Sequence, residues 1–260
     1  DDTKKILAKY KNCFDLTPKN LNCGSAANFL WLLNKAASQD LGQYVFLSDQ
    51  DDIWLPSKMQ RAISILEDGY DCYSGSYFLF DSSNCEKTLK YVNKNFDDYC
   101  LNGIFRSPGP GYTYAFKREA FLEIVNSEAL QSFYPHTETR VRWHDWLIFL
   151  VALQQRLTWF IDRKAQTLYR QHENNDTGQL TSIKQLWHRI KYVATGAYFN
   201  EVILLTNFRT DKYSDIIRTP GTKAFFLTLS VIFRIDRGWV ARLGITVSFF
   251  VYRLKISRRK

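Results

Sequence analysis

Residues 46 to 59 read FLSDQDDIWLPSKM, a stretch in which an apolar run is followed at once by clustered acids. Asp49, Asp51 and Asp52 lie directly behind the apolar residues 44–47. A strand that ends in this way places negative charge at its carboxyl end, where open α/β sheets bind their ligands. Such charge repels itself unless a cation holds it together, and a divalent metal that carries phosphates suits that role. The stretch predicts an α/β fold with a ligand site at this strand end.

From this stretch alone, a structural role for these acids is about as well supported as a metal site. Asp accepts backbone hydrogen bonds in turns between a strand and a helix, so Asp52 or Ser57 could simply cap the following helix. A calcium loop of the helix-loop-helix kind is excluded, because the sixth position counted from Asp49 is Trp54, where that loop requires Gly.

The composition indicates a folded protein. The chain has 260 residues, of which 45% are hydrophobic and 16% aromatic, which is ample for a packed core and excludes disorder of the whole chain. The only methionine is Met59, and residues 1–10 contain no apolar signal segment, so we expect the interior of a longer, non-secreted polypeptide. Five cysteines without close pairs favour reduced thiols in a cytosolic compartment.

Positive charge is concentrated at the C-terminal end. The net charge is +9, and residues 234–260 contain eight Lys or Arg against one acid, which gives +7. The remaining 233 residues therefore carry only +2. A near-neutral body without a recognisable RNA- or DNA-binding motif argues against nucleic acid as a partner.

Helical and strand patterns alternate up to about residue 180. Helices are predicted over 3–11, 26–37, 56–66, from 118 onward and 143–155, and strands over 44–48, 72–80, 112–116, 157–162 and 165–172. Residues 81–98 read as a long polar surface excursion. Beyond 180 only helices are predicted, over 182–208, 221–234 and 239–256. This order predicts a mixed, mostly parallel sheet flanked by helices, with a C-terminal helical extension.

Two further polar clusters join the first one, again at strand ends or helix starts. They are residues 144–146, with the sequence HDW, and residues 169–172, with the sequence YRQH, followed by Asn174 and Asn175. Active sites of α/β proteins are assembled at such positions.

The order SDQDDIWLPSK, GPGYTYAFKRE, HDW and LYRQHENNDTG resembles inverting family 2 glycosyltransferases of the GT-A fold, in particular the rhamnosyltransferase-like branch that builds cell-surface polysaccharides. The resemblance covers about residues 1–180 and implies a GT-A catalytic domain there, with 181–260 as a basic, aromatic-rich helical region. The family's earlier acidic motif would end at or just before residues 1–3. The resemblance thus implies that the first strand, helix and strand are absent and that these 260 residues bind donor weakly.

The resemblance also implies a donor site. Asp51 would hold a divalent metal, Mg or Mn, that neutralises the departing diphosphate, and His172 would face that metal from the far side. Asp49 would face the ribose or the water shell of the metal. Arg170 would bind the diphosphate through its planar fork, although an ordinary cross-strand contact is the alternative for Arg170 and His172. Asp52 would position the loop or cap the next helix.

On the acceptor side, Asp145 matches the base that removes the proton of the attacking hydroxyl, a contribution typically of ~10²- to 10⁴-fold in rate. The alternative for Asp145 is a helix N-cap. His144 would orient the base, and Trp146 would exclude water and stack on a sugar face.

Glycines complete the predicted site. Gly24 and Asn28 match a segment that lies along the nucleotide, and Gly109 and Gly111 match the turn that cradles the donor sugar and the acceptor. Each of these glycines could instead serve only to make a turn.

The basic C-terminal helices predict membrane contact. The apolar run 224–233 has ten residues between charges, whereas a membrane span needs ~20, so no transmembrane helix is expected. Aromatic residues among scattered Arg and Lys suit attachment in the plane of an anionic leaflet. The alternative is a helical subdomain that packs on the body.

The function expected from these features is transfer of a sugar, L-rhamnose from dTDP-rhamnose or another sugar from a UDP or GDP donor. The acceptor would be a glycan or a lipid-linked glycan at the inner face of the cytoplasmic membrane. The alternative is a non-catalytic domain that binds nucleotide or glycan without turnover.

Overall fold

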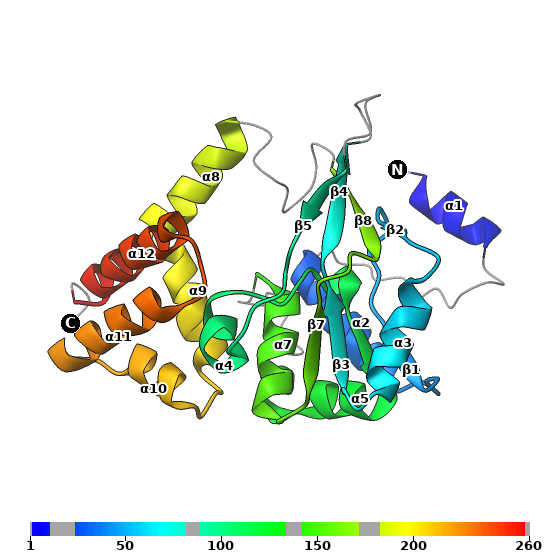
Figure 1. Ribbon diagram of the computed structural model, residues 1–260, viewed down its shortest axis with the longest axis horizontal. Helices are drawn as coiled ribbons and strands as arrows, with labels where there is room; N and C mark the ends of the chain where they lie inside the picture. The colour runs from blue at the N-terminus through cyan, green and yellow to red at the C-terminus, as the bar shows by residue number, and fades with distance from the viewer. Residues whose placement is uncertain (1, 11–23, 82–88, 134–141, 172–182, 258–260) are drawn as a thin grey trace.

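The computed structural model describes residues 2–10, 24–81, 89–133, 142–171 and 183–257. Within these ranges the chain forms an α/β body with two sheets, and a group of helices follows it in sequence and lies to one side of it (Figure 1). We call residues 183–257 the helical region.

Two four-stranded sheets form the body. The first has the order β1-β6-β3-β7, with β1 Tyr44–Phe46, β6 Ala115–Lys117, β3 Cys72–Gly75 and β7 Trp159–Asp162. The second has the order β2-β8-β4-β5, with β2 Ile53–Trp54, β8 Thr167–Gln171, β4 Tyr77–Asp81 and β5 Lys90–Val92.

The mixed α/β class with flanking helices and a C-terminal helical extension is confirmed. The expected predominance of parallel pairing is not observed among the described strands. Only β3–β7 and β4–β8 are parallel, and the other four pairings are antiparallel. The reason in the first sheet is that β6 inserts between β1 and β3 and runs opposite to both.

Seven helices accompany the sheets of the body among the described residues. They are α1 Thr3–Lys9, α2 Ser25–Ala37, α3 Lys58–Glu67, α4 Tyr99–Asn102, α5 Arg118–Asn126, α6 Glu128–Gln131 and α7 His144–Gln154, with two short 3-10 helices, η1 Gly103–Phe105 and η2 Gly111–Thr113. The helix α7 is buried from Trp146 to Ala152, because its sequence is apolar on every side rather than along one stripe. It therefore forms the centre of the main apolar core.

Three predicted elements differ from the observed ones. The strand predicted over 72–80 is interrupted at Ser76, whose Oγ donates to the Asp162 carbonyl at 3.0 Å, so that its two halves belong to different sheets. The predicted excursion over 81–98 contains β5, which pairs with β4. The helix predicted over 182–208 is interrupted at Gly196, which has φ of 73°, and a Cβ there would lie 2.9 Å from Tyr252 N.

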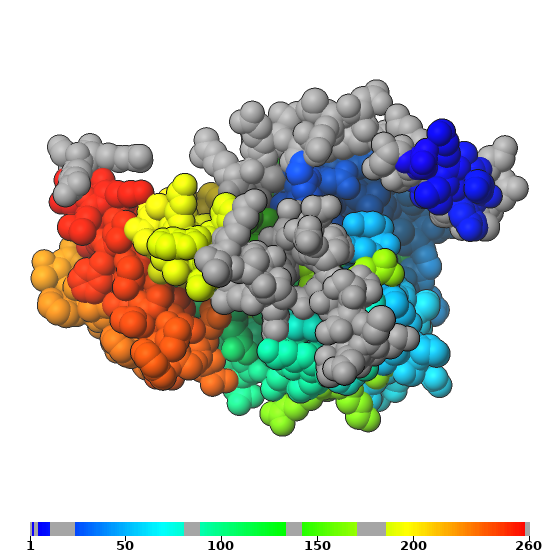
Figure 2. Space-filling view, turned by 90° about the horizontal axis from the view of Figure 1, so that it is seen from above, coloured from blue at the N-terminus to red at the C-terminus, as the bar shows by residue number. Residues whose placement is uncertain are grey.

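The helical region contains α8 Ile183–Ala194, α9 Ala197–Thr206, α10 Lys212–Arg218, α11 Thr222–Arg234 and α12 Trp239–Ser257. It packs on the body, as Figure 2 shows for the yellow to red segments against the green ones. One apolar cluster contains Leu147 and Val151 of α7 together with Phe199 of α9 and Phe249 of α12. None of the described helices is both long enough and apolar enough to span a membrane. The predicted division of the chain near residue 180 stays a prediction, since this core is continuous across it.

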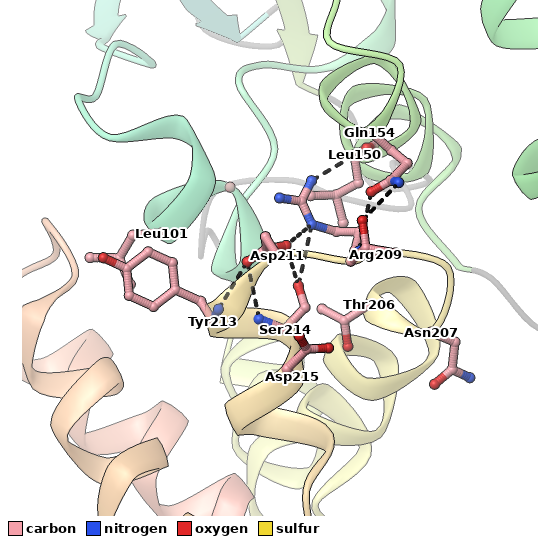
Figure 3. Close-up of polar contacts among 12 residues, drawn as sticks. Leu101, Leu150, Gln154, Thr206, Asn207, Arg209, Asp211, Tyr213, Ser214 and Asp215 are labelled. Atoms are coloured by element: carbon pink, nitrogen blue, oxygen red, sulfur yellow. Dashed lines mark hydrogen bonds and ion pairs between the residues drawn. The ribbon is translucent and has the colours of Figure 1, made fainter.

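A buried arginine ties the helical region to α7. Arg209 is 3% exposed and lies between α9 and α10, and Figure 3 shows its guanidinium between Asp211 and the backbone of Leu150. Its Nε lies 2.8 Å from Asp211 Oδ2, and its Nη1 donates to the Leu150 carbonyl at 3.4 Å. Asp211 Oδ1 in turn accepts from Ser214 N at the start of α10. This contact fixes the helical region against the helix whose first turn carries Asp145.

Candidate functional site

The acidic loop 49–52 lies at the junction of the two sheets. β1 before it belongs to the first sheet, where Leu47 N donates to the Tyr114 carbonyl at 3.1 Å. β2 after it belongs to the second sheet, where Ile53 pairs with Leu168 of β8. A loop that passes from one sheet to the other lies at a topological switch point, which is where α/β proteins place ligands.

The carboxylates of this loop are half-buried and influence one another. Burial, followed by repulsion from Asp51 and then Asp145, raises the pKa of Asp49 to about 6. Burial, followed by repulsion from Asp49 and Asp51, raises the pKa of Asp52 to about 7. Asp52 Oδ1 accepts from the backbone N–H of Arg170 at 3.3 Å, whereas its buried Oδ2 has no hydrogen-bond partner among the described residues. Burial and mutual repulsion therefore disfavour the charged forms of Asp49 and Asp52.

Lys58 lies against this loop, and no role was predicted for it. Its side chain is 1% exposed, its Nζ donates to the Tyr112 carbonyl at 2.6 Å, and Nζ lies 3.3 Å from the ring centroid of Trp54. Burial lowers the pKa of Lys58 to about 7, although Asp52 and Asp49 oppose that change. The sequence shows Lys58 a few residues after the acids, with Pro56 between them. No role was predicted for it because a lysine at a helix start usually faces solvent.

Asp145 lies in the first turn of α7, one residue after the helix begins at His144, so it is not the N-cap. Its Oδ2 accepts a hydrogen bond from Ser107 Oγ at 3.1 Å, and its Oδ1 accepts one from Trp146 N at 2.8 Å. Its backbone carbonyl accepts from Tyr114 OH at 3.2 Å. Because Asp145 contributes to the raised pKa of Asp49, the structure brings these two predicted residues into one electrostatic environment.

His144 and Gly111 lie beside Asp145. The His144 ring stacks on Phe29 of α2 with centroids 4.0 Å apart and planes 6° apart. Its buried Nε2 has no hydrogen-bond partner among the described residues, and burial lowers the pKa of His144, which favours the neutral ring. A Cβ on Gly111 would lie 2.9 Å from that Nε2, so only glycine leaves room for this ring position.

The remaining predicted residues lie around this centre in different ways. Gly109 packs closely, since a Cβ there would lie 2.9 Å from Thr113 Oγ1. Gly24 precedes α2 with φ of 81°, and Asn28 is exposed on the first turns of that helix. Arg170 has an exposed side chain, with its guanidinium carbon 5.9 Å from the centroid of the Phe80 ring. His172, Asn174 and Asn175 lie outside the described residues.

Trp146 is a core residue. It is 4% exposed, and its indole Nε1–H donates to the Gly103 carbonyl at 2.6 Å. Its ring stacks on Tyr198 of α9 with centroids 6.0 Å apart. A ring that is buried to this extent cannot contact a sugar, so we leave Trp146 out of the proposed site. The pattern HDW could not distinguish a tryptophan that points into the core from one that lines a cleft.

Three tyrosines form a wall that the sequence did not predict. The rings of Tyr112 and Tyr169 stack with centroids 5.6 Å apart and planes 5° apart. Tyr77 meets both edge-on, at 6.0 Å from Tyr112 and 5.8 Å from Tyr169. Tyr112 OH is buried without a hydrogen-bond partner among the described residues. Tyr112 and Tyr169 lie inside motifs that were recognised, but their mutual contact depends on the pairing of distant strands.

The described side chains suit a metal that is bound partly by substrate. No group of three His, Cys, Asp or Glu side chains within the described ranges forms a metal site by itself. Mg²⁺ is usually held by one or two carboxylates together with substrate phosphates, rather than by a complete protein cage. Asp49 and Asp51 fit that kind of site, and they lie next to Asp52, whose Oδ2 has no hydrogen-bond partner within the described ranges.

A family model and a related protein both match this chain, and both are glycosyltransferases. A family model described as Glycosyl transferase family 2 matches residues 1–127. The chain is 32% identical over 214 residues to the dTDP-rhamnosyl transferase RfbG of Shigella flexneri, which spans 80% of this chain and 70% of that protein.

Two solved structures are similar over the whole chain. One is the mannosyltransferase PcManGT from Pyrobaculum calidifontis in complex with GDP-Man and Mn²⁺, with a TM-score of 0.48, 14% identity and 74% of that chain covered. The other is TarS 1–349 from S. aureus, with a TM-score of 0.43, 13% identity and 80% of that chain covered.

Proposed function

This chain belongs to glycosyl transferase family 2 and has a mixed α/β fold of the GT-A type, and we propose that it transfers L-rhamnose from dTDP-rhamnose with inversion. The acceptor would be a hydroxyl of a glycan or of a lipid-linked glycan in cell-surface polysaccharide synthesis. The relative from Shigella flexneri, named as a dTDP-rhamnosyl transferase, supports this donor. The observation that carries the proposal is the convergence of the acidic loop 49–52 with Asp145.

We assign the donor diphosphate to the side of the acidic loop. Asp51 and Asp49 would hold a divalent metal, Mg or Mn, which when bound neutralises the charge of the departing diphosphate. Arg170 is suited to bind a phosphate because its side chain is exposed while its backbone N–H is fixed on Asp52. Asp52 has its Oδ1 on that backbone and so positions the loop.

We assign Asp145 as the general base. Inversion takes place in one displacement, in which the acceptor hydroxyl attacks the anomeric carbon, its proton passes to the base and the nucleoside diphosphate leaves. Ser107 and the Trp146 N–H each hold one oxygen of Asp145, and this orients the carboxylate without neutralising it. The neutral His144 ring beside Asp145 stacks on Phe29 and fits into the space that Gly111 leaves. In this position the ring keeps the Asp145 carboxylate in place.

Calorimetry with dTDP-rhamnose tests the donor site. Binding should be stronger with Mn²⁺ than with EDTA, and Asp51→Asn should weaken the metal-dependent binding by at least ~10-fold, equal to about 1.4 kcal/mol. The matched control is Asp40→Asn, which removes an exposed carboxylate that precedes β1, whereas the acidic loop follows β1. Equal binding with and without metal would overturn the metal assignment, and metal-dependent binding without turnover would favour a non-catalytic binding domain.

We also propose that the helical region attaches the protein to the inner face of the cytoplasmic membrane. An exposed apolar stripe runs along α12 with spacings of three and four residues, and further exposed apolar side chains lie on α8 and α11. Its members on α12 are Val240 64%, Leu243 54%, Val247 39%, Phe250 43% and Leu254 59% exposed. Basic side chains on the same helix, including Arg242 and Lys255, suit an anionic leaflet.

Flotation with anionic vesicles tests this attachment. Wild-type protein should float with vesicles that contain phosphatidylglycerol, and the double variant Leu243→Glu with Phe250→Glu should not. Asn200→Glu with Asn207→Glu adds the same charge at exposed sites on and after α9 and should float like wild type. Equal flotation of all proteins would exclude the stripe as the membrane contact. If all proteins float at low salt and none floats at high salt, the attachment is due to charge alone.

A further inference from the structure

We propose that Glu201, on α9 of the helical region, is a positioning residue for Asp145. Its carboxylate holds the backbone at the start of α7, and this keeps the Asp145 carboxylate directed toward the acceptor. The inference rests on the proposed function, because it takes Asp145 as the base. It adds a residue outside the α/β body on which the rate of transfer should depend.

Glu201 is a buried carboxylate whose hydrogen bond reaches the segment before α7. It is 7% exposed, and its Oε1 accepts from the Arg142 N–H at 2.8 Å. Burial raises the pKa of Glu201, and hydrogen bonds from the N–H groups of Arg142 and Trp143 oppose this change. A carboxylate is unfavourable inside a protein unless hydrogen bonds hold it. The contact with the start of α7 therefore accounts for an acid at this buried position.

The helix α7 has no cap within its own first turn. Its N-cap residue is Trp143, whose side chain makes no capping hydrogen bond. In a capping box, the third residue of the helix is Glu or Gln and bonds back to the N-cap N–H. Here the third residue is Trp146, which packs in the core. Glu201 thus supplies from α9 the carboxylate that the start of α7 lacks.

This contact leaves Asp145 available for the reaction. The start of a helix attracts carboxylates, because its first N–H groups have no partner within the helix. Asp145 is the only acid in the first turn of α7, and its Oδ1 accepts from Trp146 N at 2.8 Å. Its Oδ2 lies on Ser107 Oγ at 3.1 Å, away from the backbone that Glu201 holds. Loss of Glu201 should let the helix start move, and the base with it.

The helical region also contacts α7 elsewhere. The guanidinium carbon of Arg142 lies 5.3 Å from the ring centroid of Tyr192 on α8, a second contact at the helix start. Towards the other end, Arg209 Nη1 donates to the Leu150 carbonyl at 3.4 Å. Because the Arg209 contact remains when Glu201 is replaced, such a variant should shift the first turn of α7 rather than detach the helix.

Steady-state transfer tests this role with the full chain, dTDP-rhamnose, Mn²⁺ and octyl α-L-rhamnoside as the acceptor. Glu201→Met keeps a long side chain but removes the acceptor for the Arg142 N–H. It should lower kcat by ~10- to 100-fold, because the base is misplaced, and leave the KM for donor unchanged. Glu201→Gln keeps a side-chain oxygen and should retain most of the kcat. A wild-type kcat in Glu201→Met, or an equal loss in Glu201→Gln, would overturn the proposal.

A core variant separates positioning from stability. Ile232 is fully buried on α11, and Ile232→Ala creates a cavity within the helical region. It should lower the stability towards urea and leave the kcat of folded protein unchanged. The same loss of kcat in Ile232→Ala as in Glu201→Met would assign the effect to stability and overturn the positioning role.

An exposed variant tests the same helix start without altering the core. Arg142→Met removes the charge beside Tyr192 and should lower kcat by about 2- to 5-fold, the range for an exposed cation–π contact. Arg156→Met is the matched control, because Arg156 is exposed and follows the other end of α7. The control should have the kcat of wild type. Equal effects of the two variants would overturn the dependence of the base on this helix start.

Amide hydrogen exchange tests the anchor without turnover. The amides at the start of α7 should exchange ~2- to 30-fold faster in Glu201→Met, the range for loss of a helix cap, and like wild type in Glu201→Gln. If wild type transfers no sugar but this difference is observed, the proposed function fails and the anchor is supported. If wild type transfers sugar and Glu201→Met equals it in kcat and in exchange, only the positioning role fails. Unchanged exchange would overturn the anchor in either case.

Discussion

Replacement of Asp52 by Asn should make the metal-free protein more stable at neutral and alkaline pH. In the folded chain burial raises the pKa of Asp52 from 3.8 to about 7, and repulsion from Asp49 and Asp51 adds to this change. The folded state thus retains a proton that the unfolded state releases between pH 4 and 7. The contribution of Asp52 to stability is therefore greatest below about pH 4 and decreases as pH rises towards 7. Asn removes the charge but keeps an oxygen for the Arg170 N–H at 3.3 Å.

The structure bounds the size of this effect. A pKa that rises from 3.8 to about 7 corresponds to at most ~4 kcal/mol, at about 1.4 kcal/mol for each pH unit. Asp52 is half-buried, so solvent screening and local relaxation reduce the expected gain to ~1–2 kcal/mol at pH 8. At pH 4 the gain should be close to zero, because the carboxyl is then protonated in the folded state.

Urea unfolding in EDTA at pH 4, 5.5 and 8 measures this difference. The stability of Asp52→Asn relative to wild type should increase steadily across the three pH values. Asp40→Asn removes an exposed carboxylate and should show no such trend. A difference that is constant with pH, or a variant that is less stable than wild type at pH 8, would refute the conclusion that the acidic loop is electrostatically strained without a cation.

Three further predictions concern the base and its surroundings. Asp145→Asn should reduce kcat by ~10²- to 10⁴-fold and leave donor binding unchanged, as measured by rapid-mixing kinetics and calorimetry; equal turnover would remove the assigned base. Trp146→Phe should cost ~2 kcal/mol of stability, because the Gly103 carbonyl loses its 2.6 Å hydrogen bond, while the kcat of folded protein stays the same. A selective loss of acceptor affinity in that variant would instead return Trp146 to the sugar site. Gly111→Ala places a Cβ 2.9 Å from His144 Nε2, so it should cost ~1–3 kcal/mol and lower kcat by displacing the base; wild-type kcat with unchanged stability would show that this close contact is not required.

Much of the site could be predicted because short motifs carry its chemistry. The apolar run before Asp49 predicts a strand that ends in acids, and β1 followed by the acidic loop is what the structure contains. Asp145 and Gly111 were both predicted near the acceptor, and Gly111 does lie against His144, the neighbour of Asp145. These features are local in sequence, so pattern and turn chemistry are sufficient to find them.

The remainder depends on contacts between distant segments. Lys58 meets the Tyr112 carbonyl only because α3 packs against the turn that contains Tyr112. The break of the predicted strand at Ser76 follows from the Asp162 carbonyl that its hydroxyl binds, 86 residues away in sequence. Trp146 was assigned to a sugar because it is an aromatic residue beside the predicted base, whereas the packing of α7 against Gly103 directs it into the core. Sequence patterns do not contain these tertiary partners.

The most direct measurement of the central claim is the configuration of a sugar that the chain transfers. The full chain is incubated with millimolar dTDP-rhamnose, Mn²⁺ and an acceptor glycan, and the product is analysed by NMR of its anomeric proton and carbon. The proposed single displacement at Asp145 predicts a rhamnosyl product whose anomeric configuration is opposite to that of the donor, formed by wild type and not by Asp145→Asn. A product with the configuration of the donor, or the same product yield from Asp145→Asn, would contradict it.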